Sequence, residues 1–245
     1  MGVAVFLRPR RLGRLLAADA MNIARDPMLL FAVGLSLVPS VALALFRGQL
    51  DAAAVSSFGI AEFSRFVVPL ALMIPAMLIG WVTGFLLLED RDEGLIAALA
   101  VTPVGKVGYL GYRVAATALV TGAVTAMATL LLLPRAGWFQ QALLVALVAC
   151  EAVLAAVVLP AVARNKVEGL AVTKLSNLAG AVPLLAILAT SWRLVAGIVP
   201  SFWIGELLGL SSGPSLPLPL TVALAVGTHL AAVVLLFRLF ARRLA

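Results

Sequence analysis

The sequence predicts an all-α integral membrane protein with six transmembrane helices. Mean hydropathy is +1.14, and only 12% of the residues are charged. Soluble globular domains carry about twice that share of charge. The apolar residues form long runs of about 20 residues, which is the length that an α-helix needs to cross a hydrocarbon core of about 30 Å. These runs are apolar on every face and do not alternate, so they do not fit the strands of a membrane β-barrel.

The six predicted spans occupy most of the 245 residues and leave no room for a separate soluble domain. We therefore expect one transmembrane domain over residues 1–245. Its spans are expected at about 28–46, 66–88, 114–133, 142–163, 170–190 and 220–239.

The net charge of +7 is explained by membrane topology rather than by a nucleic-acid partner. If the N-terminus is cytoplasmic, fourteen of the eighteen basic residues fall in cytoplasmic segments and four in external ones. Such a bias predicts that both termini are cytoplasmic, and it favours contact with anionic lipids. The cytoplasmic set is Arg8, Arg10, Arg11, Arg14, Arg25, Arg91, Lys106, Arg113, Arg164, Lys166, Lys174, Arg238, Arg242 and Arg243, and the external set is Arg47, Arg65, Arg135 and Arg193.

Residues 1–26 precede the first span and show helical spacing of apolar residues after Pro9, with arginines between them. This pattern predicts an interfacial amphipathic helix on the cytoplasmic leaflet. The alternative is a basic tail without fixed structure that acts only as a topology signal. The first apolar run lacks a small-residue cleavage site, so we expect no cleaved signal peptide.

The second predicted span contains signals of close helix packing and of bending. Gly80 and Gly84 in the second span form a G-x-x-x-G pattern, which we assign to packing within the chain rather than to a dimer face. Pro69 and Pro75 in the same span are expected to kink it.

Residues 191–219 mix Trp, Gly and Pro, and their apolar runs are too short to span a membrane. They predict an external segment that lies flat or dips into the membrane, with its tryptophans in the aromatic belt.

An acidic stretch interrupts this apolar chain at the end of the second span. Residues 66–88 hold no charge, whereas residues 89–93 are all charged and contain four of the eleven carboxylates. The cytoplasmic loop that follows runs to Arg113, longer than a plain connection requires. Acidic residues favour a helix start, and Leu95, Ile96 and Leu99 would supply an apolar face. The pattern predicts a short helix under the membrane, either docking on a cytoplasmic partner or merely solvated.

The stretch "LLLEDRDEGLIAALAVTPVGKVGYLGYR" resembles the signature of ABC-2 type transporter permeases, in which a span ends in Glu-x-Glu/Asp-x-Gly before a short helix and a Thr-Pro break. More narrowly, the chain is similar to the short permease subunits of actinobacterial fluoroquinolone and drug exporters. The resemblance implies that the short helix is a coupling helix seated on an ATPase subunit. The coupling residues would be Glu89, Asp90, Arg91, Asp92, Glu93, Gly94, Leu95, Leu99, Thr102 and Pro103.

The chain contains no phosphate-binding P-loop. The sequence around Gly105-Lys106 has Ala100 and Val107 where the motif requires Gly and Ser or Thr. The chain therefore needs no cofactor of its own, and ATP and Mg²⁺ would be bound by a separate ATPase subunit. The resemblance implies two such ATPase subunits and a second permease, either another copy or a paralogue. It also implies a location in the bacterial cytoplasmic (inner) membrane.

Ionisable residues within the spans mark a candidate translocation path. Glu151 lies near the centre of the fourth span and His229, the only histidine, in the sixth. A charge at this depth costs a few kcal/mol, so Glu151 should face the bundle interior or be protonated. The alternative for each residue is ordinary packing. Arg193 and Glu206 flank the external segment and are expected at headgroup depth.

The sequence thus favours a permease subunit, without enzyme activity of its own, of an ATP-driven exporter of small amphipathic drugs or lipid-like compounds. One alternative is a polysaccharide or lipid export permease. A second, from another class, is a membrane enzyme that modifies lipids through Glu151 and His229. A third is a membrane scaffold that transports nothing. Motifs of known hydrolase and phospholipid-synthase sites are absent from the sequence.

Overall fold

A computed structural model describes residues 27–101 and 105–244 of the chain. The predicted N-terminal helix over residues 1–26 lies outside the described residues, as do Thr102 and Pro103. The long helices are α2 (Pro27–Phe58), α3 (Ser64–Asp92), α5 (Gly105–Leu132), α6 (Trp138–Val162), α7 (Lys166–Ala181) and α9 (Leu218–Leu244). Shorter elements are α4 (Leu95–Ala98), α8 (Phe202–Leu207) and the 3₁₀ helices η2 (Leu99–Val101), η3 (Val182–Ile187) and η4 (Ser191–Ile198). The described residues contain no strand.

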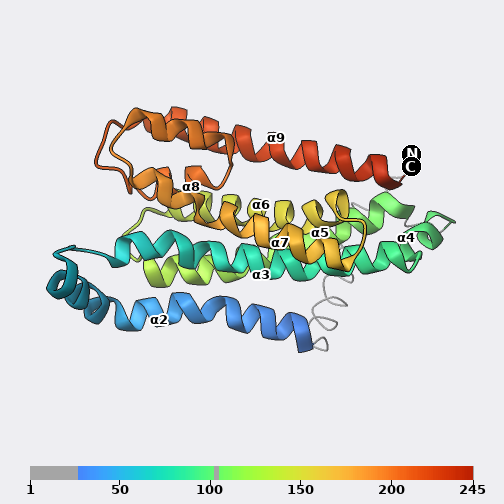
Figure 1. Ribbon diagram of the computed structural model, residues 1–245, viewed down its shortest axis with the longest axis horizontal. Helices are drawn as coiled ribbons and strands as arrows, with labels where there is room; N and C mark the ends of the chain where they lie inside the picture. The colour runs from blue at the N-terminus through green and yellow to red at the C-terminus, as the bar shows by residue number, and fades with distance from the viewer. Residues whose placement is uncertain (1–26, 102–104, 245) are drawn as a thin grey trace.

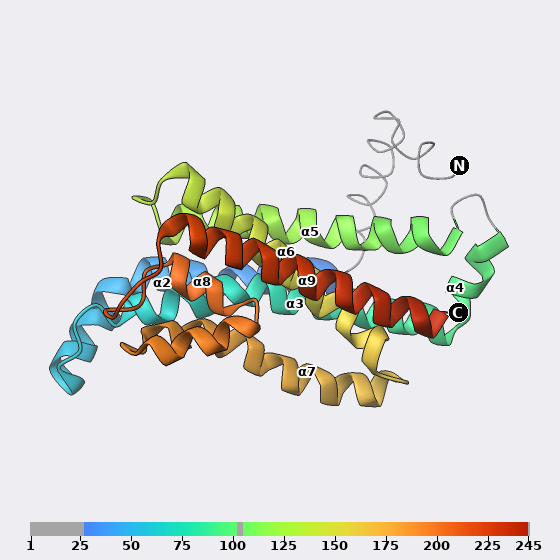
Figure 2. The ribbon, with the colours of Figure 1, turned by 90° about the horizontal axis from the view of Figure 1, so that it is seen from above.

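The predicted class is confirmed, because six helices of the described chain are long and apolar enough to cross a membrane. Their axes run along one direction in an elongated bundle (Figures 1 and 2). Helices α3 and α6 are the most buried and form its centre, while α2 and α9 lie at opposite edges in Figure 1. The short helix α4 and the C-terminal end of α9 lie at the same end of the bundle in both views.

Several element boundaries differ from the sequence prediction. Helix α2 continues to Phe58, so the first part of the expected external loop is helical. The fifth span, expected as one helix over 170–190, ends its α-helical part at Ala181 and continues as η3 to Ile187. The break coincides with Pro183, which has no backbone N–H and cannot continue the α-helical hydrogen bonding. Helix α3, in contrast, runs uninterrupted through Pro69 and Pro75.

Close packing of α3 against α6 depends on the two glycines of the G-x-x-x-G pattern. A Cβ atom on Gly80 would lie 2.6 Å from the carbonyl oxygen of Ala152, and one on Gly84 would lie 2.7 Å from Cδ1 of Leu159. Small residues let helix backbones approach in this way, and dispersion contacts then hold the pair together. The prediction of packing within the chain is therefore confirmed.

Residues 191–219 fold into a compact segment that packs against the helix bundle. Phe202, Trp203 and Ile204 of α8 are buried in a core cluster that also contains Leu144 and Val148 of α6. The expectation that the tryptophans lie in the aromatic belt is wrong for Trp203, whose Nε1 donates to the carbonyl of Gly197 at 3.0 Å. Trp192, in contrast, is 81% exposed.

Arg193 and Glu206, which the sequence predicts at headgroup depth, form a buried ion pair inside this segment. Arg193 Nε lies 2.6 Å from Glu206 Oε1, and the side chains are 0% and 4% exposed. Arg193 also donates to the carbonyl oxygens of Thr190 and Pro214. The guanidinium can be buried here because its charge and its donors are satisfied within the segment.

Candidate functional site

The charged stretch forms the last turn of α3 and not the first turn of a new helix. Helix α3 ends at Asp92, with Glu93 as its C-cap. Gly94 follows with a φ of 75°, a left-handed conformation that glycine adopts without a Cβ penalty. The expectation that the carboxylates begin the short helix is therefore wrong. Carboxylates at a helix C-terminus are unfavourable toward the helix dipole, so they need other partners.

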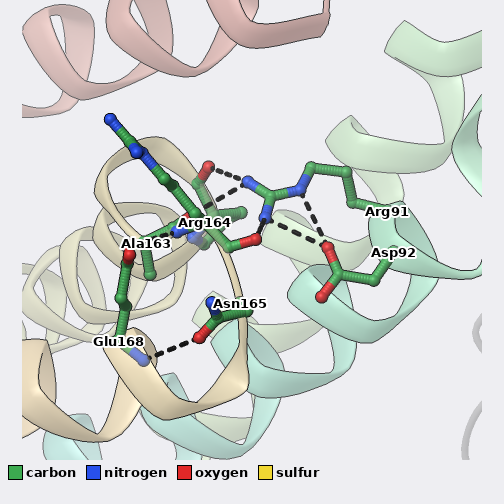
Figure 3. A network of polar contacts seen from close by, with 7 residues as sticks. Arg91, Asp92, Ala163, Arg164, Asn165 and Glu168 are labelled. Carbon is green, nitrogen blue, oxygen red and sulfur yellow. Dashed lines mark hydrogen bonds and ion pairs between the residues drawn. The ribbon is translucent and has the colours of Figure 1, made fainter.

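Arg91 joins the end of α3 to the end of α6, as Figure 3 shows. Its guanidinium donates to the carbonyl oxygens of Pro160 at 2.9 Å, Ala163 at 3.0 Å and Arg164 at 2.9 Å, and it also contacts Asp92. The last carbonyls of a helix have no partner within the helix, and a cation at this end also complements the dipole. Arg91 thus caps α6 from a neighbouring helix.

Two more charged residues of the stretch are paired within the chain. Lys166 Nζ at the start of α7 lies 2.7 Å from Glu89 Oε1. Tyr109 of α5 donates its hydroxyl hydrogen to Asp90, and Arg113 Nε donates to the Tyr109 oxygen at 2.8 Å. Glu89, Asp90 and Arg91 therefore connect the end of α3 to α7, α5 and α6, respectively. We call these three residues the brace.

Helix α4 presents one buried and one exposed side. Ile96 is 2% exposed and packs in a cluster with Leu87, Leu110 and Phe240. Leu95 is 42% exposed and Val101, in η2, is 91% exposed. Glu93 is exposed directly before them, and Leu99 is partly buried. We call Glu93, Leu95 and Val101 the end patch. The one acidic and two apolar residues are spread over the C-cap of α3, α4 and η2, a segment that Ile96 anchors to the bundle.

Glu151 and His229 face each other across the contact between α6 and α9. Glu151 Oε1 lies 3.2 Å from His229 Nε2, and their side chains are 7% and 1% exposed. The two atoms are within ion-pair distance but are not aligned for a hydrogen bond, and neither has another partner among the described residues. His229 Nδ1 lies 2.7 Å from the carbonyl of Ala225. A carbonyl only accepts, so Nδ1 carries a hydrogen and Nε2 faces the acid.

The structure brings together residues that the sequence analysis considered separately. Glu151 and His229 were each candidates for the path, and their pairing depends on the α6–α9 packing, which no local pattern encodes. Tyr109, Arg113 and Lys166, which hold the acidic turn, were missed as site residues. The available signal was the basic charge of Arg113 and Lys166 in the cytoplasmic loops, which we interpreted only as topology.

The comparisons with known proteins match nearly the whole chain. The family model described as "Fluoroquinolones export permease protein Rv2686c-like" matches residues 19–237. The chain belongs to this family. It is 30% identical over 242 residues to the fluoroquinolones export permease proteins Rv2686c and MT2760 of two Mycobacterium tuberculosis strains. The alignment covers 95% of this chain and 94% of each relative.

No solved structure matches the chain. The family assignment and the six apolar helices make it a multi-pass membrane protein of the export permease type. The family match spans the acidic turn, the brace and its partners, and both Glu151 and His229.

Proposed function

We propose that this chain is the permease subunit of an ATP-driven ABC-2 type exporter, and that a separate ATPase subunit docks on its α4 end. The main support for this proposal is the exposure of the end patch. Glu93 caps the end of α3, Leu95 lies in α4 and Val101 lies in η2, and all three are exposed. This segment packs on the bundle end through Ile96 and follows a charged turn with partners on three helices. An exposed apolar pair beside an acid suits a groove on a partner protein.

The brace supports a coupling role for the remaining charged residues. Glu89, Asp90 and Arg91 connect the end of α3 to three neighbouring helices, so a displacement of α4 is passed to them as well as to α3. Arg91 and the glycine packing hold α3 and α6 as one unit over their shared length. In this proposal Gly94, Leu99, Thr102 and Pro103 belong to the coupling segment, and the ATPase moves this segment through its contact with the end patch.

The α4 end would be cytoplasmic. The described helices place Arg91, Lys106, Arg113, Arg164, Lys166 and Arg242 at or near this end. The positive-inside rule assigns such an end to the cytoplasm, together with both termini. The membrane would then be the bacterial cytoplasmic membrane. Two ATPase subunits, which bind ATP and Mg²⁺, and a second permease would complete the transporter.

The substrate class follows from the relatives, which are named for the export of fluoroquinolones. We infer that this chain moves small amphipathic drugs of that chemical type, or lipid-like compounds of similar size. An interior that is mostly apolar with one acid–histidine pair is compatible with such molecules.

The test is co-purification of the chain with a candidate P-loop ATPase that has no membrane spans of its own. We expect the Leu95→Asp, Val101→Asp double variant to reach the membrane in normal yield and to lose the ATPase. Val55→Asp is the matched control, because Val55 is 52% exposed near the far end of α2. If the patch variant retains the ATPase as the wild type does, the docking surface lies elsewhere. If the wild type retains no P-loop ATPase, the transporter proposal is overturned.

In the second outcome the membrane-enzyme alternative would gain support. Glu151 and His229 lie within 3.2 Å and could exchange a proton. That alternative predicts an activity on lipids that needs no ATP and that Glu151→Gln abolishes.

A further inference from the structure

We propose that Glu151 binds the cationic amine of the exported compound within the membrane, and that His229 is the internal group that this amine replaces. The inference rests on the proposed export function and names the chemistry of its substrate site: an amphipathic molecule with a protonated amine. Neither residue belongs to the proposed ATPase contact, which lies at the end of the bundle.

Glu151 and His229 each have a buried side-chain atom that makes no hydrogen bond. Glu151 Oε1 and His229 Nε2 are 3.2 Å apart, yet each lacks a hydrogen-bond partner among the described residues. A pair kept only for packing is expected to align its atoms, since an unsatisfied buried polar group costs about 1–3 kcal/mol.

Among the described residues of α6 and of the helices packed against it, Glu151 is the one carboxylate near the middle of a span. Residues 66–88 of α3 and 114–132 of α5, which pack on α6, contain no ionisable side chain. On α6 the only other ionisable group is the Cys150 thiol next to Glu151. On α8, Glu206 is held by Arg193. Lys174 of α7 is exposed on the outside of the bundle.

Movement of the α3–α6 unit gives the substrate access to Glu151. Glu151 lies on α6, which Arg91 and the glycine packing join to α3, the helix that leads into α4, whereas His229 lies on α9 at the edge of the bundle. If α6 and α9 separate, the carboxylate loses the imidazole that faces it. A buried carboxylate without a partner is strongly unfavourable, so an ammonium group is bound in its place. When the helices close, the imidazole competes for the carboxylate again and favours release of the amine.

The experiment measures binding of two probes to the purified full-length chain in lipid discs. Norfloxacin carries a piperazine amine that is protonated at neutral pH, and its N-acetyl derivative lacks that charge but keeps the ring system. Glu151→Gln is nearly isosteric and removes only the charge. Glu151→Asp keeps the charge and serves as the conservative variant. To check folding, each variant is heated, and the temperature at which Cys150, the only cysteine, becomes accessible to a thiol reagent is measured.

We expect Glu151→Gln to weaken norfloxacin binding by about tenfold or more, as for loss of a hydrogen bond to a charged group. Binding of the acetyl derivative is expected to be weak and equal in both proteins, and Glu151→Asp should restore part of the norfloxacin affinity. Equal norfloxacin affinity in wild type and Glu151→Gln would overturn the inference, as would an equal loss for both probes. Absence of saturable norfloxacin binding to the wild type would also overturn it.

The norfloxacin-binding experiment and the ATPase co-purification can fail independently of each other. A Glu151→Gln chain that keeps its ATPase but loses norfloxacin supports both proposals. A wild-type chain that binds norfloxacin through Glu151 without retaining an ATPase supports the cation site and refutes the docking proposal.

Discussion

Arg193 Nε lies 2.6 Å from Glu206 Oε1 in a segment where both side chains are almost completely buried. The pair connects η4 to α8, and Arg193 also holds the carbonyl of Pro214 in the loop before α9. This part of the fold therefore depends on a buried charge pair as well as on the packing of Phe202 and Trp203.

Removing one partner of this pair should destabilise the protein strongly. Glu206→Gln leaves the Arg193 charge buried without its counterion, and we expect a loss of about 3–5 kcal/mol. Thermal unfolding in detergent, reported by labelling of Cys150, measures the change. Arg135→Ala is the control, because Arg135 is an exposed arginine at the same end of the bundle and should change little. An unchanged unfolding temperature for Glu206→Gln would refute the structural role of the pair.

Hydropathy was sufficient to predict the six spans, because the length of an apolar run is set by the bilayer and not by the partner helices. It was insufficient for residues 191–219. The sequence predicted a headgroup depth for Arg193 and Glu206 but not that the two residues pair with each other inside the protein. Their burial depends on each other: Arg193 is satisfied by Glu206 and by backbone carbonyls that only the folded segment brings near.

In the candidate site, too, the sequence shows the unusual residues but not the partners that the fold brings to them. The acidic stretch and Glu151 stand out in the sequence because charge is rare in an apolar chain. Their partners Lys166, Tyr109 and His229 lie between 19 and 78 positions away and are reached through helix packing. A local pattern also assigned the acids to a helix start, where the dipole favours them, whereas the structure uses them at a helix end with basic partners.

Arg91 should be irreplaceable by lysine. The guanidinium reaches three carbonyls of the α6 end at once, and an ammonium is a point charge that lacks this fork of donors. We expect Arg91→Lys to lower stability by about 2 kcal/mol, as for loss of charged hydrogen bonds. Arg164→Lys is the control. The Arg164 side chain is exposed, and Arg91 contacts only the backbone carbonyl of this residue, which the substitution keeps. Equal unfolding temperatures for the two variants would contradict the capping role.

Gly80 should not tolerate a side chain. A Cβ atom would lie 2.6 Å from the Ala152 carbonyl and 2.7 Å from the Ala155 Cβ, so α3 and α6 would have to separate. We expect Gly80→Ala to cost roughly 1–3 kcal/mol, as for overpacking in a core. Gly34→Ala in α2 is the matched control, since no atom lies within 4 Å of the added Cβ. The apparent unfolding temperature should fall for Gly80→Ala alone, and an equal response of both variants would argue against the close helix contact.

The Glu89–Lys166 pair distinguishes a brace from a charge that the ATPase recognises. The acid lies at the C-terminal end of α3 and the lysine at the N-terminal end of α7, so both oppose their helix dipoles. The swapped variant Glu89→Lys, Lys166→Glu keeps the pair and reverses both unfavourable placements. Because both side chains are about half exposed, we expect stability to change by less than about 1 kcal/mol. We expect ATPase co-purification to equal that of the wild type, whereas Glu89→Lys alone should reduce it through repulsion from Lys166. A swapped protein of normal stability that loses the ATPase would show instead that the partner contacts the Glu89 carboxylate directly.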